Sequence, residues 1–195
     1  MEQTPHQQMV TALVKPGSDI LASLTPAKCN LIHMTWGITG EFLEICQAMD
    51  DTSFVSIPGK SLENLIEELG DMEFFCEGFM QEMGWSYVEI IEASINAPSV
   101  SGYNNYLNAV EKVADIMKKH LMYNKPLTDE QLSTLKYNLA RICQENVELM
   151  LLAGITREEA LEVNMQKLTK GDTARYKTGS YSDQQAKDRA DKAGA

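Results

Sequence analysis

Residues 31–46 read LIHMTWGITGEFLEIC and carry the clearest helical pattern of the chain. Apolar side chains recur there at intervals of three and four residues, which places them along one face of an α-helix. These side chains are Leu31, Ile32, Met34, Ile38, Phe42 and Ile45. Upstream, Thr25 and Pro26 match a helix N-cap followed by proline at the first helical position. The pattern therefore predicts a long helix from Pro26 to about Met49.

The rest of the chain predicts further helices and no strand. Capping boxes begin at Ser86, Thr128 and Thr156, each with Glu or Gln three residues later, and Ser61 can cap a second long helix. With the proline and glycine breaks, these signals predict helices over about 61–84, 87–96, 103–122, 129–153 and 157–169, and loops at 50–60 and 98–102. No segment sustains the period of two that marks a strand, so the predicted fold class is all-α, a helical bundle.

The sequence predicts one helical domain between two arms, which suits a chain of 195 residues. Residues 1–24 are polar and irregular, and Pro16 and Gly17 break them into a short helix and an arm. Residues 25–169 carry the helical signals and form the expected helical domain. Residues 170–195 are rich in Gly, Ser, Asp, Lys and Ala, so we expect an extended C-terminal arm.

The helical domain contains an approximate repeat with a spacing of 70 residues. A glycine, an apolar residue and a capping box follow one another at 84–89 and again at 154–159. The apolar frame of 65–71 also recurs at 135–141, where the acidic residues are missing. Two interpretations stay open. Either a metal-binding half at 25–97 was duplicated into a degenerate half at 102–169, or two helical hairpins simply share similar caps.

The composition describes an acidic globular protein. Hydrophobic residues make up 44% of the chain and charged residues 23%, with a net charge of −11. This charge argues against duplex nucleic acid as a partner, because such binding depends on Lys and Arg at phosphates. No apolar run approaches the roughly 20 residues that span a bilayer, and no signal peptide is visible at the N-terminus. We expect no membrane partner and a cytoplasmic location, in the host cytoplasm if the protein is viral.

Four cysteines are spread along the chain without a CxxC pair. This spacing favours reduced thiols in the core over a disulfide framework or a zinc site.

Two pairs of carboxylates are the most informative residues. Glu41 and Glu44 lie three apart on the first long helix, Glu68 and Asp71 lie three apart on the second, and 23 residues separate the pairs. Residues three apart share a helical face, so an antiparallel helix pair can gather all four. Oxygen ligands without His or Cys suit Mg²⁺ or Mn²⁺. The alternative is that both pairs belong to solvated acidic helix faces.

The spacing Glu41-x-x-Glu44 and Glu68-x-x-Asp71 resembles the ExxE and ExxD signature of the MazG-like all-α nucleoside triphosphate pyrophosphohydrolases. Further segments resemble bacteriophage members of this family: 15–17, 24–26, 31–34, 37–41, 67–71, 123–126, 154–158, 181–183 and 188–191. The resemblance implies a bundle of two helical hairpins and assembly as a homodimer or a dimer of dimers.

The implied reaction is the Mg²⁺-dependent hydrolysis of a nucleoside triphosphate to a monophosphate and pyrophosphate, in control of a nucleotide pool. Mn²⁺ is a possible substitute. The substrate can be an NTP or a dNTP, with a weak preference for a purine dNTP. The resemblance assigns the metal-binding and catalytic roles to the four carboxylates, with Glu67 supporting them.

Residues near the C-terminus match the late Asn-x-x-Lys-Leu motif of the family and its following basic residues. The resemblance implies that Asn164, Lys167, Arg175 and Tyr176 bind substrate, with Lys170 as a further phosphate contact. A solvated basic arm is the alternative.

His33 and Trp36 precede Glu41 on the same helix and can face the base of the nucleotide. A core histidine and a core tryptophan are nevertheless the favoured interpretation.

Two other classes of protein are alternatives to such an enzyme. A carboxylate-bridged di-iron site in a helical bundle requires Glu-x-x-His, and none of the three histidines has Glu three residues before it. A non-enzymatic helical interaction module, or an inactive relative, stays open. Pyrophosphate release from nucleotides with Mg²⁺ distinguishes these alternatives.

Overall fold

A computed structural model describes residues 3–51, 59–93 and 103–188 of the chain. Every regular element in these ranges is a helix, and they contain no strand. The predicted all-α class is therefore confirmed. None of the helices in these ranges combines the length and the apolar character needed to cross a membrane.

The helices differ greatly in length, and the four longest build the body of the molecule. Their bounds are α1 Pro5–Leu13, α2 Gly17–Ser23, α3 Pro26–Asp51, α4 Gly59–Met83, α5 Tyr87–Glu92, α6 Tyr103–Met122, α7 Asp129–Leu152, α8 Arg157–Met165, the π-helical turn η1 Gln166–Lys170 and α9 Asp183–Asp188.

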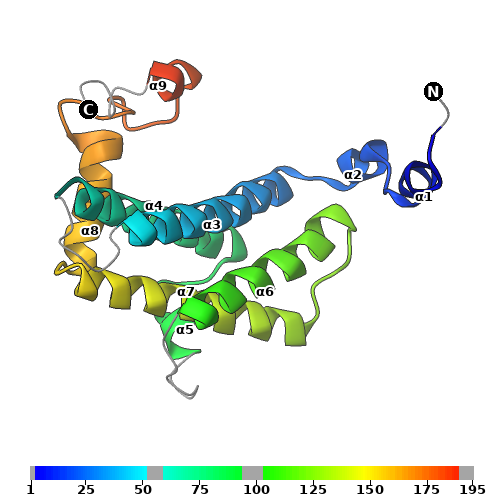
Figure 1. Ribbon diagram of the computed structural model, residues 1–195, viewed down its shortest axis with the longest axis horizontal. Coiled ribbons are helices and arrows are strands. Elements are labelled where there is room, and N and C mark those ends of the chain that lie inside the picture. Colours follow the sequence, from blue (N-terminus) through cyan, green and yellow to red (C-terminus); the bar gives the residue numbers. More distant parts are fainter. Residues whose placement is uncertain (1–2, 52–58, 94–102, 189–195) are drawn as a thin grey trace.

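The long helices pack in two neighbouring pairs, α3 with α4 and α6 with α7 (Figure 1). The pairs join because α3 also packs on α6 and α4 on α7, while α5 lies on α7. Helix α8 crosses α4 at a steep angle (Figure 1). As a result, α4 contacts helices from both halves of the chain.

The apolar stripe of α3 is buried in this body. Leu31, Ile38, Phe42 and Ile45 are nearly inaccessible, and Ile32 and Met34 pack half-buried against the same core. Side chains with no exposed surface on α4 and α7 face this core: Leu69, Met72 and Phe79 from α4, and Leu135, Leu139 and Ile142 from α7. Burial of each large aliphatic side chain stabilises the fold by about 1.5–3 kcal/mol, so this stripe fixes which face of α3 is left for other residues.

The three predicted capping boxes are confirmed. In each box, the hydroxyl of the cap residue (Ser86, Thr128 or Thr156) accepts a hydrogen bond from the backbone amide three residues later. The side chain of that later residue accepts a hydrogen bond from the backbone amide of the cap residue. The predicted start of α4 is wrong by two residues, because the helix begins at Gly59 and Ser61 lies inside it. Residues 50–51 and 59–60 of the loop expected at 50–60 belong instead to α3 and α4. The remaining residues 52–58 and the loop expected at 98–102 lie outside the described residues. Helix α5 ends at Glu92, earlier than the expected end near Asn96.

The N-terminal arm contains two short helices, where the sequence predicted one. Thr4 caps α1 with a capping box of its own, and α2 begins directly after Pro16. Neither helix has a buried residue, and the arm extends away from the body (Figure 1). Lys15 Nζ ties it to the end of α6 by donating to the Met122 carbonyl at 2.7 Å.

The C-terminal segment folds back on the body, so the expected extended arm is wrong as far as residue 188. The backbone amides of Arg175 and Tyr176 donate to the carbonyls of Lys167 and Leu168 at 2.9 and 2.8 Å. Ala174 is buried. These contacts place the segment after η1 next to α3 and α4, on the side opposite the N-terminal arm (Figure 1).

All four cysteines are free thiols. Cys76 and Cys143 are buried and Cys46 is half-buried, which agrees with the expected core thiols. Cys29 is exposed, so that expectation is wrong for this residue.

Candidate metal centre

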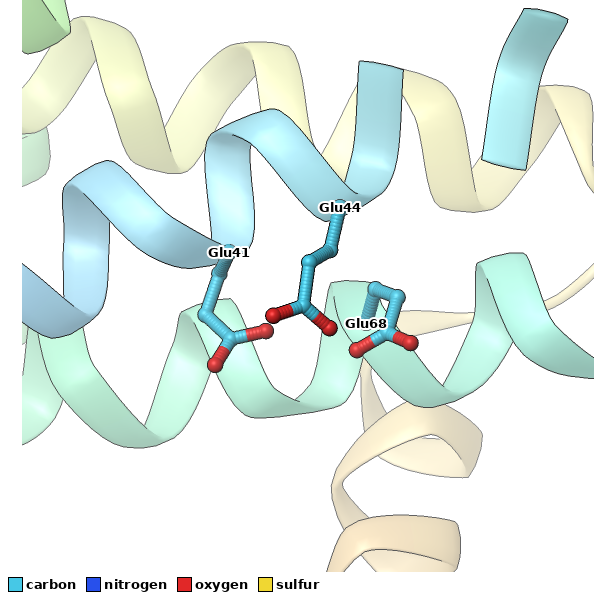
Figure 2. A group of neighbouring side chains, drawn as sticks. All are labelled: Glu41, Glu44 and Glu68. Atoms are coloured by element: carbon cyan, nitrogen blue, oxygen red, sulfur yellow. The ribbon is translucent and has the colours of Figure 1, made fainter. Parts of the chain in front are cut away.

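Three carboxylates converge between α3 and α4. Glu41 and Glu44 point from α3 toward α4, where Glu68 points back toward them (Figure 2). One carboxylate oxygen of each lies within 4.8 Å of the others. The arrangement follows from the spacing, because Phe42 and Ile45 are buried in the core and turn the two glutamates to the edge of the same helix face.

Asp71, the fourth predicted ligand, lies one turn beyond Glu68 on α4. It faces the same cavity as Glu41, but its carboxylate is held by α8 and η1. Asn164 Nδ2 donates to Asp71 Oδ1 at 2.5 Å, and the Lys167 ammonium pairs with Oδ2. The structure thus brings Glu41, Glu44 and Glu68 together and places Asp71 beside them with partners of its own.

The carboxylates raise one another's pKa. Burial, then the charges of Asp71, Glu44 and Glu68, raise the pKa of Glu41 from 4.5 to about 8. Burial and the neighbouring carboxylates raise the pKa of Glu68 to about 6, against the lowering effect of Lys167. A bound cation opposes the same repulsion, so these shifts describe a cluster that is short of positive charge.

One oxygen of this cluster also has no hydrogen-bond partner. Glu41 Oε2 is buried and accepts no hydrogen bond, although an unpaired buried polar atom is costly. The donor set of the cluster is all oxygen, which suits a hard divalent cation such as Mg²⁺ or Mn²⁺. The residues present therefore fit the metal that the sequence predicted.

Asn164 and Lys167 reach Asp71 because α8 approaches α4 closely at Gly70. A Cβ at position 70 would lie 3.1 Å from both the Ala160 carbonyl oxygen and Asn164 Cβ. Lys167 Nζ also lies 3.0 Å from Glu67 Oε1. Both residues were predicted to bind substrate, and Glu67 to support the ligands. In the structure, Asn164 contacts the Asp71 carboxylate, and Lys167 pairs with both Asp71 and Glu67.

A cavity of about 370 Å³ opens beside the carboxylates. It is lined by His33, Glu41, Asp71, Phe74, Phe75, Leu168, Thr169, Arg175, Tyr176, Gly179, Ser180 and Tyr181. Arg175 and Tyr176, predicted to bind substrate, both lie in its wall. Lys170 is not among the described residues that line the cavity, and its ammonium pairs with Glu162 at 3.2 Å.

His33 and Trp36 are not core residues, so the favoured interpretation of both is wrong. His33 is exposed and lines the cavity. Trp36 is 69% exposed and is not among the described residues that line it. Residues 33 and 36 lie on the outer face of α3, whereas the apolar stripe around Ile38 fills the inner face.

Sequence reasoning missed three aromatic residues of the cavity wall. Phe74 and Phe75 follow Asp71 by three and four residues, so their place on the same helix face was a usable signal. Tyr181 lies in a loop of the C-terminal segment, and no local pattern indicates where that loop folds.

The fold and this cluster define an all-helical protein with a candidate divalent-metal centre between two helices and a partly aromatic cavity next to it. No protein-family model matches the chain, and no curated protein and no solved structure is significantly similar to it.

Proposed function

We propose that the protein hydrolyses a nucleoside or deoxynucleoside triphosphate to the monophosphate and pyrophosphate, with Mg²⁺ as the cofactor. The observation that carries this proposal is the convergence of Glu41, Glu44 and Glu68 within 4.8 Å at the edge of a cavity. Carboxylates packed this closely favour the binding of cations, and divalent cations in turn attract a triphosphate to an otherwise acidic surface.

Bound divalent cations would neutralise the triphosphate, polarise its phosphorus and lower the pKa of an attacking water. The protein contributes mainly positioning, which dominates phosphoryl transfer. Glu41, Glu44 and Glu68 would hold the cations. Asn164 and Lys167 fix the Asp71 carboxylate at the edge of the group. Arg175 adds a positive charge to the cavity wall.

The resemblance to MazG-like enzymes is part of the proposal, and the helix packing supports it. The pairs α3–α4 and α6–α7 are what two fused hairpins would produce. On this proposal, Asn138 and Arg141 occupy the positions of Glu68 and Asp71 in the second half. The second half would then have kept the fold and lost the cation site.

The corners that end α4 and α7 support an internal duplication. Gly84 and Gly154 have φ of +69° and +80°, a conformation that glycine adopts without strain. The next residue in each corner donates to the carbonyl five residues earlier, Trp85 to Met80 and Ile155 to Met150. A capping box follows both corners, so the two match bond for bond at a spacing of 70 residues.

Pyrophosphate release from a panel of NTPs and dNTPs with Mg²⁺ tests the function. We expect turnover that EDTA abolishes and Mn²⁺ restores. Glu44→Gln should lower the turnover by about a hundredfold or more. Loss of a residue that only supports a metal ligand costs up to about a hundredfold, and loss of a ligand itself should cost at least as much. Glu63→Gln is the matched control, because Glu63 is exposed on α4 and is not one of the clustered carboxylates.

Two outcomes would contradict the proposal. Absence of turnover with every nucleotide would indicate a non-enzymatic helical module. Iron-dependent colour in the purified protein would indicate a di-iron site instead.

A further inference from the structure

Two groups of aromatic rings face the cavity from different parts of the chain. On α3 and α4, the Phe75 ring lies edge-on to His33 and to Phe74, with centroids 5.7 and 5.3 Å apart. On the C-terminal segment, the rings of Tyr176 and Tyr181 lie 5.7 Å apart. All five rings line the same cavity.

The rings are held in place although much of their surface is open. A Cβ at Gly37 would lie 2.1 Å from the Phe75 ring, so only glycine there lets this ring lie against α3. The Tyr181 hydroxyl donates to Asp183 Oδ1 at 2.7 Å. Yet Tyr181 is 73% exposed and Phe74 is 46% exposed. Fixed rings with uncovered faces are suited to stacking on a flat ligand.

The carboxylates lie at the border of this cavity, and their position determines how a ligand is oriented in it. Glu41 and Asp71 line it together with the rings. A molecule with its anionic end at the cations therefore extends its other end along the aromatic walls. Thr169 and Ser180 also line the wall, where they add polar residues beside the rings.

We propose that this cavity binds the base of the nucleotide between the α3–α4 rings and the C-terminal tyrosines, and that Tyr181 is the residue that determines specificity for a nucleotide over a phosphate chain without a base. The inference rests on the proposed function and deepens it. It also gives the C-terminal segment a role, because this segment supplies one wall of the cavity. A volume of about 370 Å³ suits a base with part of its sugar.

Steady-state kinetics of Tyr181→Ala with a nucleoside triphosphate and with inorganic tripolyphosphate test this inference. Loss of one stacking ring should raise KM for the nucleotide by about thirtyfold, the middle of the range for base stacking, and leave its kcat within about twofold. The kinetics with tripolyphosphate should not change. Tyr181→Phe should retain most of the wild-type KM. Tyr123→Ala is the matched control, because Tyr123 is exposed at the far end of α6.

A binding experiment separates this inference from the proposed function. The probes are a nucleotide with an α,β-imido bridge and imidotriphosphate without a base, titrated with Mg²⁺ in a calorimeter. If the wild type hydrolyses nothing but Tyr181→Ala weakens the nucleotide alone, the function fails and the inference holds. Equal loss of both probes, an unchanged nucleotide affinity in Tyr181→Ala, or no nucleotide binding by the wild type would overturn the inference.

Discussion

Glu41 lies at the boundary between the core and the cavity, and its position explains its chemistry. Phe42 beside it is buried in the core, while its own carboxylate meets three others. Its pKa of about 8 reflects first the loss of water and then this repulsion. Because the carboxylates interact strongly, the observed titration belongs to the group more than to any single member.

Without divalent cations, the free energy of unfolding should fall as pH rises from about 5 to about 8. The folded-state pKa values of Glu41 and Glu68, about 8 and about 6, lie above the ordinary 4.5. The folded protein therefore binds more protons than the unfolded chain, and its stability decreases through this window. Urea unfolding at several pH values, with EDTA or with Mg²⁺, measures the effect.

Mg²⁺ should remove most of this fall, because it binds the ionised cluster in the folded state alone. Glu41→Gln should flatten the pH dependence in EDTA. A wild type whose stability rises from pH 5 to 8 in EDTA would contradict the assigned pKa shifts.

Glu73 is a second buried carboxylate, and it is fully paired. It is 2% exposed, and it accepts from Asn146 Nδ2 at 2.9 Å and from Arg157 Nε at 2.7 Å. Arg157→Ala should lower the free energy of unfolding by about 3 kcal/mol, because it leaves the buried charge without its cation. Lys170→Ala removes an exposed pair and should cost less than about 1 kcal/mol. Equal losses in urea unfolding would contradict this ranking.

At the scale of elements, sequence reasoning succeeded where a local pattern sets the structure. Ser86, Thr128 and Thr156 cap helices in the structure at the positions that their sequence motifs predicted. The carboxylates on α3 and α4 could be placed on facing edges from their spacing. The fold of the C-terminal segment could not be predicted, because it depends on backbone bonds from Arg175 and Tyr176 to η1.

The site was likewise predictable only in its local part. The pairing of Asp71 with Asn164 and Lys167 joins residues more than 90 positions apart, which one sequence does not reveal. The outward direction of Trp36 was missed because a tryptophan inside an apolar helix is usually counted as core.

The two equivalent caps should differ in their effect on the site. Ser86→Ala and Thr156→Ala each remove a capping hydroxyl and should each lower the free energy of unfolding by about 1 kcal/mol. Only Thr156 caps the helix that carries Asn164 toward Asp71. Thr156→Ala should therefore also raise the Mg²⁺ concentration needed for half-maximal turnover, whereas Ser86→Ala should not. An equal shift of the Mg²⁺ requirement in both variants would contradict the expected effect of the Thr156 cap on Asn164 and Asp71.

At the scale of the whole molecule, the two ends of the chain have unequal roles. Deletion of residues 1–14 removes α1, which has no buried residue, and should change the free energy of unfolding by no more than about 0.5 kcal/mol. Deletion of residues 171–195 removes one wall of the cavity and should lower kcat/KM for nucleotides. Urea unfolding and steady-state kinetics of both truncations measure this. A larger kinetic defect in the N-terminal deletion would contradict the assignment.

The fold-back of the C-terminal segment has a practical consequence for anyone who purifies the protein. Helix α9 ends at Asp188, only a few residues after the loop whose Tyr181 borders the cavity. An affinity tag fused after this helix would add chain close to the cavity and would hinder the entry of a ligand. A tag on the N-terminal arm avoids this interference, because that arm projects from the opposite side of the body (Figure 1).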